Sequence, residues 1–137
     1  ESSLDILNDR AMDALRQVGL DSFADELAVN LPYGRKRALE IAATVAMNPE
    51  LMLLDEPTQG MGHEDVSLVT ELIKRVSQGR TVLMVEHNMK VVANIANTIS
   101  VLQRGEVIAE GPYEQVSKNP QVMEAYMGTA DSELQGH

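Results

Sequence analysis

The chain has 137 residues, 44% of them hydrophobic, which fits one domain with a core of its own. Asp and Glu number 21 against 11 Lys and Arg, and the net charge of -10 argues against nucleic acid or an anionic bilayer as a partner. There is no cysteine, so disulfides and thiolate metal sites are excluded. No apolar run approaches the roughly 20 residues of a membrane span, and the first residues lack signal-peptide features. We therefore expect a cytoplasmic protein.

The first third of the chain predicts two helices. Apolar residues recur at helical spacing over residues 5–18, and Gly19 is a plausible stop. Residues 20–32 indicate a short helix or a loop. A second helix is expected over 35–47, with basic residues in its first turn. These oppose the helix dipole, so either a nearby anion relieves the mismatch or the turn is simply solvated.

The middle of the chain predicts two strands separated by a helix. The apolar run 51–54 stops at Asp55-Glu56-Pro57, and the run 81–85 stops at Glu86-His87-Asn88. Short continuous apolar runs are typical of strands that are buried on both faces. A helix is expected between them, over 64–76.

The last third predicts a short helix over 89–96 and then a hairpin formed by 98–102 and 106–109. One more helical pattern covers 121–127, and 131–137 is expected to fray. Strands that alternate with helices favour an open, largely parallel α/β sheet. Ligands bind such sheets beyond the carboxyl ends of the strands.

Asp55, Glu56 and His87 are the residues that indicate chemistry at that edge. Adjacent carboxylates with separate roles suit magnesium-dependent phosphoanhydride hydrolysis, because Mg²⁺ takes hard oxygen ligands and the attacking water must be oriented. Taken alone, an acidic turn after a strand or a surface histidine is the commoner explanation. The order and spacing of the segments are more specific than any one of them.

Three segments in order carry a resemblance: Leu31-Pro32-Tyr33-Gly34 opening a helix, Leu51 to Thr58, and Val85-Glu86-His87. Together they resemble the nucleotide-binding subunit of ABC transporters over nearly the whole chain. The resemblance implies the C-terminal part of a P-loop NTPase (RecA-like) ABC ATPase domain plus part of its helical subdomain. It also implies ATP and Mg²⁺ as ligands, and head-to-tail pairing of two subunits over two ATP molecules.

The resemblance also assigns roles to single residues. Glu56 is the catalytic carboxylate, His87 is the switch histidine and Asp55 helps to hold Mg²⁺. The signature motif, which meets the ATP of the partner subunit, corresponds to Leu31, Pro32, Tyr33, Gly34 and Arg35. The D-loop corresponds to Gln59, Gly60, Met61 and Gly62.

The variant looks closest to subunits of branched-chain amino acid and related amide importers. The matching segments are Tyr33-Gly34, 39–42, 86–89, 101–105, 109–111 and 124–128. The implied partners are a second ATP-binding subunit, identical or different, and transmembrane permease subunits, with no nucleic acid. The implied location is peripheral, on the inner face of the cell membrane.

Some positions depart from the family pattern. Pro32 stands where the family usually has serine, Arg35 replaces a glutamine, and Gly62-His63 replaces a polar residue and proline in the D-loop. Proline supplies neither a hydroxyl nor a backbone N–H. We expect the phosphate contact of this motif to come from Gly34 and its neighbours.

The chain contains no G-x-x-x-x-G-K-[ST] phosphate loop. We expect a fragment that is inactive alone, with the helical subdomain over 1–48, the ATPase core over 49–130 and a tail over 131–137. Strand 81–86 would have an unpaired edge, which predicts rearranged pairing or a swapped oligomer. Two alternatives stay open: a non-catalytic ABC-like module that docks on a complete ATPase, and a non-transport ABC ATPase.

Overall fold

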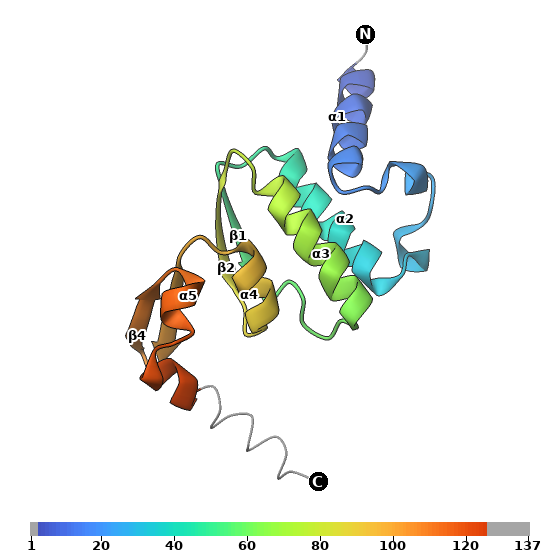
Figure 1. Ribbon diagram of the computed structural model, residues 1–137. Helices are drawn as coiled ribbons and strands as arrows, with labels where there is room; N and C mark the ends of the chain where they lie inside the picture. Colours follow the sequence, from blue (N-terminus) through green and yellow to red (C-terminus); the bar gives the residue numbers. More distant parts are fainter. Residues whose placement is uncertain (1–2, 126–137) are drawn as a thin grey trace. The chain divides into compact units, whose positions relative to one another are not determined.

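The computed structural model describes residues 3–125, and the chain divides into two compact units, residues 1–91 and 92–137. Figure 1 shows the elements in chain order. The first unit contains α1 (Ser3–Gln17), α2 (Tyr33–Ala46), β1 (Leu51–Asp55), α3 (His63–Val76) and β2 (Thr81–Val85). Helix α4 (Met89–Ile95) crosses the boundary between the units. The three predicted helices and two predicted strands of this unit are confirmed, with ends that differ by a few residues at most.

Helix α1 ends where the sequence predicts. Gly19 has a φ of +71°, a left-handed conformation that glycine adopts without the penalty of a Cβ atom. The connection to α2 contains two single turns of 3-10 helix, Asp21–Phe23 and Ala28–Asn30. The expected short helix or loop is therefore two tight turns that carry the chain to the start of α2.

The core of the first unit lies between α2 and α3, which run side by side in Figure 1. The buried apolar residues are Ala38, Ile41, Ala42 and Val45 of α2 and Val69, Leu72, Ile73 and Val76 of α3. Each set recurs at intervals of three and four residues, so it occupies one helix face. This packing fixes the start of α2 relative to the start of α3, where the candidate site residues lie.

Strands β1 and β2 pair in parallel, from Leu51 opposite Thr81 to Asp55 opposite Val85. Because parallel strands end at the same edge of a sheet, the residues after Asp55 and after Val85 meet there. The ladder therefore brings the two polar segments of the sequence together.

One expectation about these strands is wrong. They were expected to be buried on both faces, but Leu53 is 67% exposed and Leu83 is 62% exposed, while Met52 is 1% exposed. Successive side chains of a strand point to opposite faces, and the described residues cover only the face that carries Met52. An apolar run shows that both faces of a strand carry apolar side chains. It does not show that other elements of the chain cover both faces.

The second unit contains the predicted hairpin. Strands β3 (Ile99–Gln103) and β4 (Glu106–Gly111) pair antiparallel, with a register shift between Val101 and Leu102. At the turn, Arg104 and Gly105 both have positive φ. Helix α5 (Tyr113–Val116), which the sequence pattern did not indicate, packs against both strands.

Residues 120–125 are helical, which confirms the described part of the helix expected over 121–127. The expectation of a frayed end over 131–137 lies outside the described residues. The two pairs of strands form separate sheets, so among residues 3–125 the second edge of β2 has no strand partner. No helix of that range has both the length and the apolarity needed to cross a bilayer.

Candidate functional site

Glu56 lies directly after β1, at a sharp change of chain direction. Its N–H donates a hydrogen bond to the carbonyl oxygen of Val85 at 2.8 Å, which extends the parallel ladder by one bond. Its φ of +43° lies in the left-handed region, which is uncommon for a residue other than glycine. Strained backbone of this kind is found disproportionately at functional sites. The carboxylate is thereby presented at the carboxyl end of the sheet.

His87 lies beside Glu56, as the parallel ladder requires. Its Nδ1 is 3.4 Å from Oε1 of Glu56, and the two side chains are 68% and 34% exposed. A carboxylate at this distance orients an imidazole ring. The two residues to which the resemblance assigns catalysis are therefore brought together from segments about 30 residues apart.

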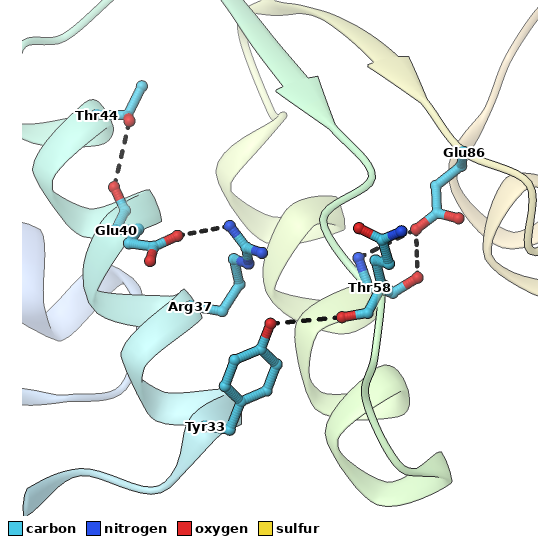
Figure 2. A network of polar contacts seen from close by, with 7 residues as sticks. Tyr33, Arg37, Glu40, Thr44, Thr58 and Glu86 are labelled. Atoms are coloured by element: carbon cyan, nitrogen blue, oxygen red, sulfur yellow. Dashed lines mark hydrogen bonds and ion pairs between the residues drawn. The ribbon is translucent and has the colours of Figure 1, made fainter.

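Glu86 is the connection between these segments that the sequence reasoning did not single out. Its Oε1 accepts a hydrogen bond from the N–H of Thr58 at 3.1 Å and another from the hydroxyl of Thr58. Its Oε2 accepts the N–H groups of His87 and Asn88, each at 3.0 Å. Thr58 and Glu86 face one another across the two loops in Figure 2.

The four hydrogen bonds make Glu86 a structural carboxylate. Both of its oxygens are occupied, and Thr58 is only 5% exposed, so these charge-assisted bonds lie partly out of water. They hold the loop that follows Glu56 against the loop that carries His87. The available signal was an acid directly before the site histidine and a threonine directly after Asp55-Glu56-Pro57.

Asp55 ends β1 and is exposed. Among the described residues, no group of three or more His, Asp or Glu side chains is placed to hold a metal ion. Mg²⁺ does not need such a group, because it keeps several waters and is usually held by one or two carboxylates together with substrate phosphates. A single exposed carboxylate at the strand end fits that mode of binding and no tighter one.

The signature segment forms the start of α2. Leu31 is buried at 7% exposure, and Pro32 is the N-cap, with no side-chain hydrogen bond to the first turn. Tyr33 is 52% exposed, and its hydroxyl donates to the carbonyl oxygen of Gln59 at 3.5 Å (Figure 2). The signature and D-loop segments, which the sequence separates, are therefore in contact within one chain.

Arg35 has a partner inside the chain. Its guanidinium lies over the ring of Phe23, 4.2 Å from the centroid, an arrangement that attracts a cation to an aromatic face. Arg35 and Arg75 also line a cavity of about 210 Å³ between the end of α1 and helices α2 and α3. A contact of Arg35 with phosphate stays a prediction.

The D-loop segment is the turn between β1 and α3. Gly60 has a φ of +74°, where a side chain would be strained, and Gly62 is the N-cap of α3. Met61, between them, is half-buried. The two glycines therefore shape the turn, whatever further contacts the segment makes.

Arg37 of α2 faces the end of β1. It forms an ion pair with Glu40 at 2.6 Å, drawn in Figure 2, and its Nε is buried without a hydrogen-bond partner among the described residues. Arg37 lines a cavity of about 150 Å³ together with Leu53, Asp55 and Pro57. A cationic side chain of the signature helix therefore lies close to the candidate magnesium ligand.

Comparison with protein families agrees with this geometry. Residues 5–59 match the ABC transporter family, and residues 106–132 match the family described as branched-chain amino acid ATP-binding cassette transporter. The structure is similar to that of MJ1267, an ATP-binding cassette of an ABC transporter, in its ADP conformation, with a TM-score of 0.79. The two sequences are 26% identical, and the match covers 93% of this chain and 57% of that one. The predicted fold class, part of a P-loop NTPase domain of the ABC type, is confirmed.

Among curated proteins, the chain is 40% identical to LivG of Escherichia coli K12, a high-affinity branched-chain amino acid transport ATP-binding protein, over 89% of this chain and 49% of LivG. It is 38% identical to BraF of Pseudomonas aeruginosa, which has the same description, over 85% of this chain and 46% of BraF. The chain thus spans about half the length of these relatives. In its motifs, its fold and these matches, the chain is similar to the ATP-binding subunits of ABC transporters.

Proposed function

We propose that this chain is part of the ATP-hydrolysing subunit of an ABC transporter that imports branched-chain or related amino acids. The observation that carries the proposal is the approach of His87 to Glu56, 3.4 Å apart, at the carboxyl ends of two parallel strands. A carboxylate and an imidazole in that position suit the orientation of water and the sensing of a phosphate. The family match over residues 5–59 gives independent support.

The proposed roles follow from position. Glu56 accepts a hydrogen bond from the attacking water and aligns it, and His87 contacts the γ-phosphate. Asp55 is the ligand that this chain offers to Mg²⁺, which supplies charge neutralisation when it is bound. The first turn of α2 at Tyr33 and Gly34 presents backbone N–H groups to the ATP of a partner subunit, as helix N-termini do toward anions.

The grip on ATP requires residues beyond these 137. The chain contains no G-x-x-x-x-G-K-[ST] motif, whose backbone and lysine hold the β- and γ-phosphates in P-loop ATPases. The proposal assigns that loop to the part of the relatives' length that this chain does not match. The 137 residues alone are expected to bind ATP weakly and to hydrolyse it negligibly.

The import of branched-chain amino acids is supported by residues 106–132, which match a family specific to that class of transporter. The proposed partners are a second ATP-binding subunit and transmembrane permease subunits, with the ATPase attached peripherally to the inner face of the membrane. Closure and reopening of the subunit pair would shift the permease between two access states.

The test is ATP turnover by the subunit that carries this chain, with Glu56→Gln as the variant. Turnover is expected to fall to background, while binding of a fluorescent ATP analogue persists, because the amide keeps the size of the side chain and loses its basicity. Glu50→Gln, which changes an exposed carboxylate just before β1, is the control. If Glu56→Gln keeps full turnover, Glu56 is not catalytic. If only a mixed dimer with a complete ATPase hydrolyses ATP, the docking-module alternative is favoured.

A further inference from the structure

Gly34 and Asp65 touch, although they open different helices. Gly34 is a buried residue in the first turn of α2, and Asp65 is half-buried in the first turn of α3. A Cβ atom on Gly34 would lie 2.4 Å from Oδ1, 2.8 Å from Cγ and 3.2 Å from Cβ of Asp65. The first two separations are shorter than real Cβ contacts, so no larger residue fits at position 34 without movement of Asp65.

This requirement for glycine is steric and not conformational. Gly34 is absent from the glycines with positive φ, so its backbone is one that any residue can adopt. Rotation of the Asp65 side chain would move Oδ1 and Cγ away, but the Asp65 Cβ atom stays at 3.2 Å whatever the rotamer. The two helix starts would therefore have to separate by a few tenths of an ångström to accept alanine.

The charges around the contact favour it. The first five residues of α2 include Arg35, Lys36 and Arg37, and the first turn has no acidic residue and no side-chain cap. Its unpaired N–H groups add partial positive charge. The Asp65 carboxylate lies against this turn and supplies negative charge there, although residues 3–125 contain no ion pair between Asp65 and the three basic residues.

A second contact joins the same two segments. Tyr33, the neighbour of Gly34, donates its hydroxyl hydrogen bond to the carbonyl oxygen of Gln59, at the other end of the segment 59–65. Consecutive residues of the signature turn thus touch both ends of the D-loop connection. We propose that Asp65 is a positioning residue, which packs on Gly34 and holds the signature turn and the D-loop segment as one unit.

The effect of this contact on ATP turnover rests on the proposed function, since the signature turn is where a partner's ATP would bind. A shift of the D-loop segment at α3 is transmitted to the signature turn through Asp65. Gly34 is then needed within the chain because it leaves room for Asp65, which is a requirement separate from any contact of this turn with phosphate.

The experiment is a suppressor test on the 137-residue chain, followed by thermal unfolding. Gly34→Ala is expected to lower the Tm by about 4 °C or more, and Asp65→Gly in the same molecule is expected to recover most of that loss. The matched control pairs Gly34→Ala with Glu64→Gly, which puts the same helix-weakening glycine one position away and removes an equal charge. That double variant is expected to melt below Gly34→Ala alone.

Turnover by the subunit that carries the chain supplies a readout that mere stability does not move. At a temperature where all variants are folded, Gly34→Ala is expected to lower ATP turnover by about tenfold or more. Asp65→Gly, and not Glu64→Gly, should restore a substantial part of it. If Gly34 matters only for phosphate access, no substitution at Asp65 restores turnover, and the positioning role is rejected.

The Tm values of these variants test the contact between Gly34 and Asp65 even if no ATP turnover is found. A Gly34→Ala variant that melts within about 1 °C of the parent chain, or a Glu64→Gly suppressor as good as Asp65→Gly, would overturn the inference. A parent subunit without ATPase activity would overturn the proposed function and leave the contact to be judged on melting alone.

Discussion

The carboxylate of Glu86 holds Thr58 with one oxygen and the backbone of His87 with the other, at 3.1 Å and 3.0 Å from the two N–H groups. These bonds lock the loop after β1 to the loop after β2. The approach of His87 to Glu56 therefore depends on a residue to which no catalytic role is assigned. Each oxygen of the Glu86 carboxylate accepts two hydrogen bonds. Loss of the carboxylate therefore removes bonds to both loops.

Glu86→Gln should destabilise the chain by about 1–3 kcal/mol, because the amide nitrogen would meet N–H donors where an acceptor is needed. The measurement is urea denaturation followed by far-ultraviolet circular dichroism. Glu50→Gln, an exposed carboxylate in the same unit, is the matched control and should change the free energy of unfolding by less than about 0.5 kcal/mol. Equal effects of the two substitutions would refute the role assigned to Glu86.

Thr58→Val removes one hydroxyl donor to Glu86 and keeps the shape of the side chain and the backbone N–H bond. The expected cost is about 1 kcal/mol, and Thr58→Ser should recover most of it. The comparison is Thr44→Val, since the Thr44 hydroxyl bonds to the carbonyl oxygen of Glu40 within its own helix. A cost at Thr58 no larger than at Thr44 would show that the inter-loop hydroxyl bond contributes nothing.

Met52→Ala and Leu53→Ala test the two faces of β1 at neighbouring positions. Met52 is 1% exposed, so its truncation should cost about 2–5 kcal/mol. Leu53 is 67% exposed and should cost less than about 0.5 kcal/mol in this chain. Chemical denaturation of both variants under one set of conditions measures the difference. Similar losses at both positions would mean that Leu53 is covered in solution.

The open edge of β2 and the exposed side chains on its face predict self-association of the chain. Leu83 and Val85 are 62% and 58% exposed, and among the described residues β2 pairs only with β1. Sedimentation velocity over a range of concentrations should show an increasing weight-average mass. Leu83→Lys should weaken association, and Leu102→Lys, which changes an exposed leucine of the hairpin, serves as the comparison. A mass of one chain at all concentrations contradicts the prediction.

Local periodicity and strand ends were sufficient to predict much of the fold and part of the site. The helices followed from three- and four-residue spacing, and the meeting of Glu56 with His87 followed because parallel strands end at one edge. Glu86 was missed because its two bonds to Thr58 depend on how two loops 28 residues apart face each other. No local pattern encodes that.

The sequence was also insufficient to predict whether each face of a strand is covered by other elements. An apolar run indicates that its side chains favour burial, but the element that covers them is encoded by residues elsewhere in the sequence. The same holds for Gly34, whose need to be glycine comes from Asp65, a residue of another helix. In both cases the missing information is a distant neighbour.

At Glu56 the residue that would be most stable in this backbone conformation differs from the residue that the proposed reaction needs. A left-handed conformation disfavours any residue with a Cβ atom by about 1 to 2 kcal/mol relative to glycine, and Glu56 adopts it with a φ of +43°. Engineering for heat resistance alone would therefore favour glycine at this position. The improved protein would hold its shape better and would have lost the carboxylate proposed to act on water.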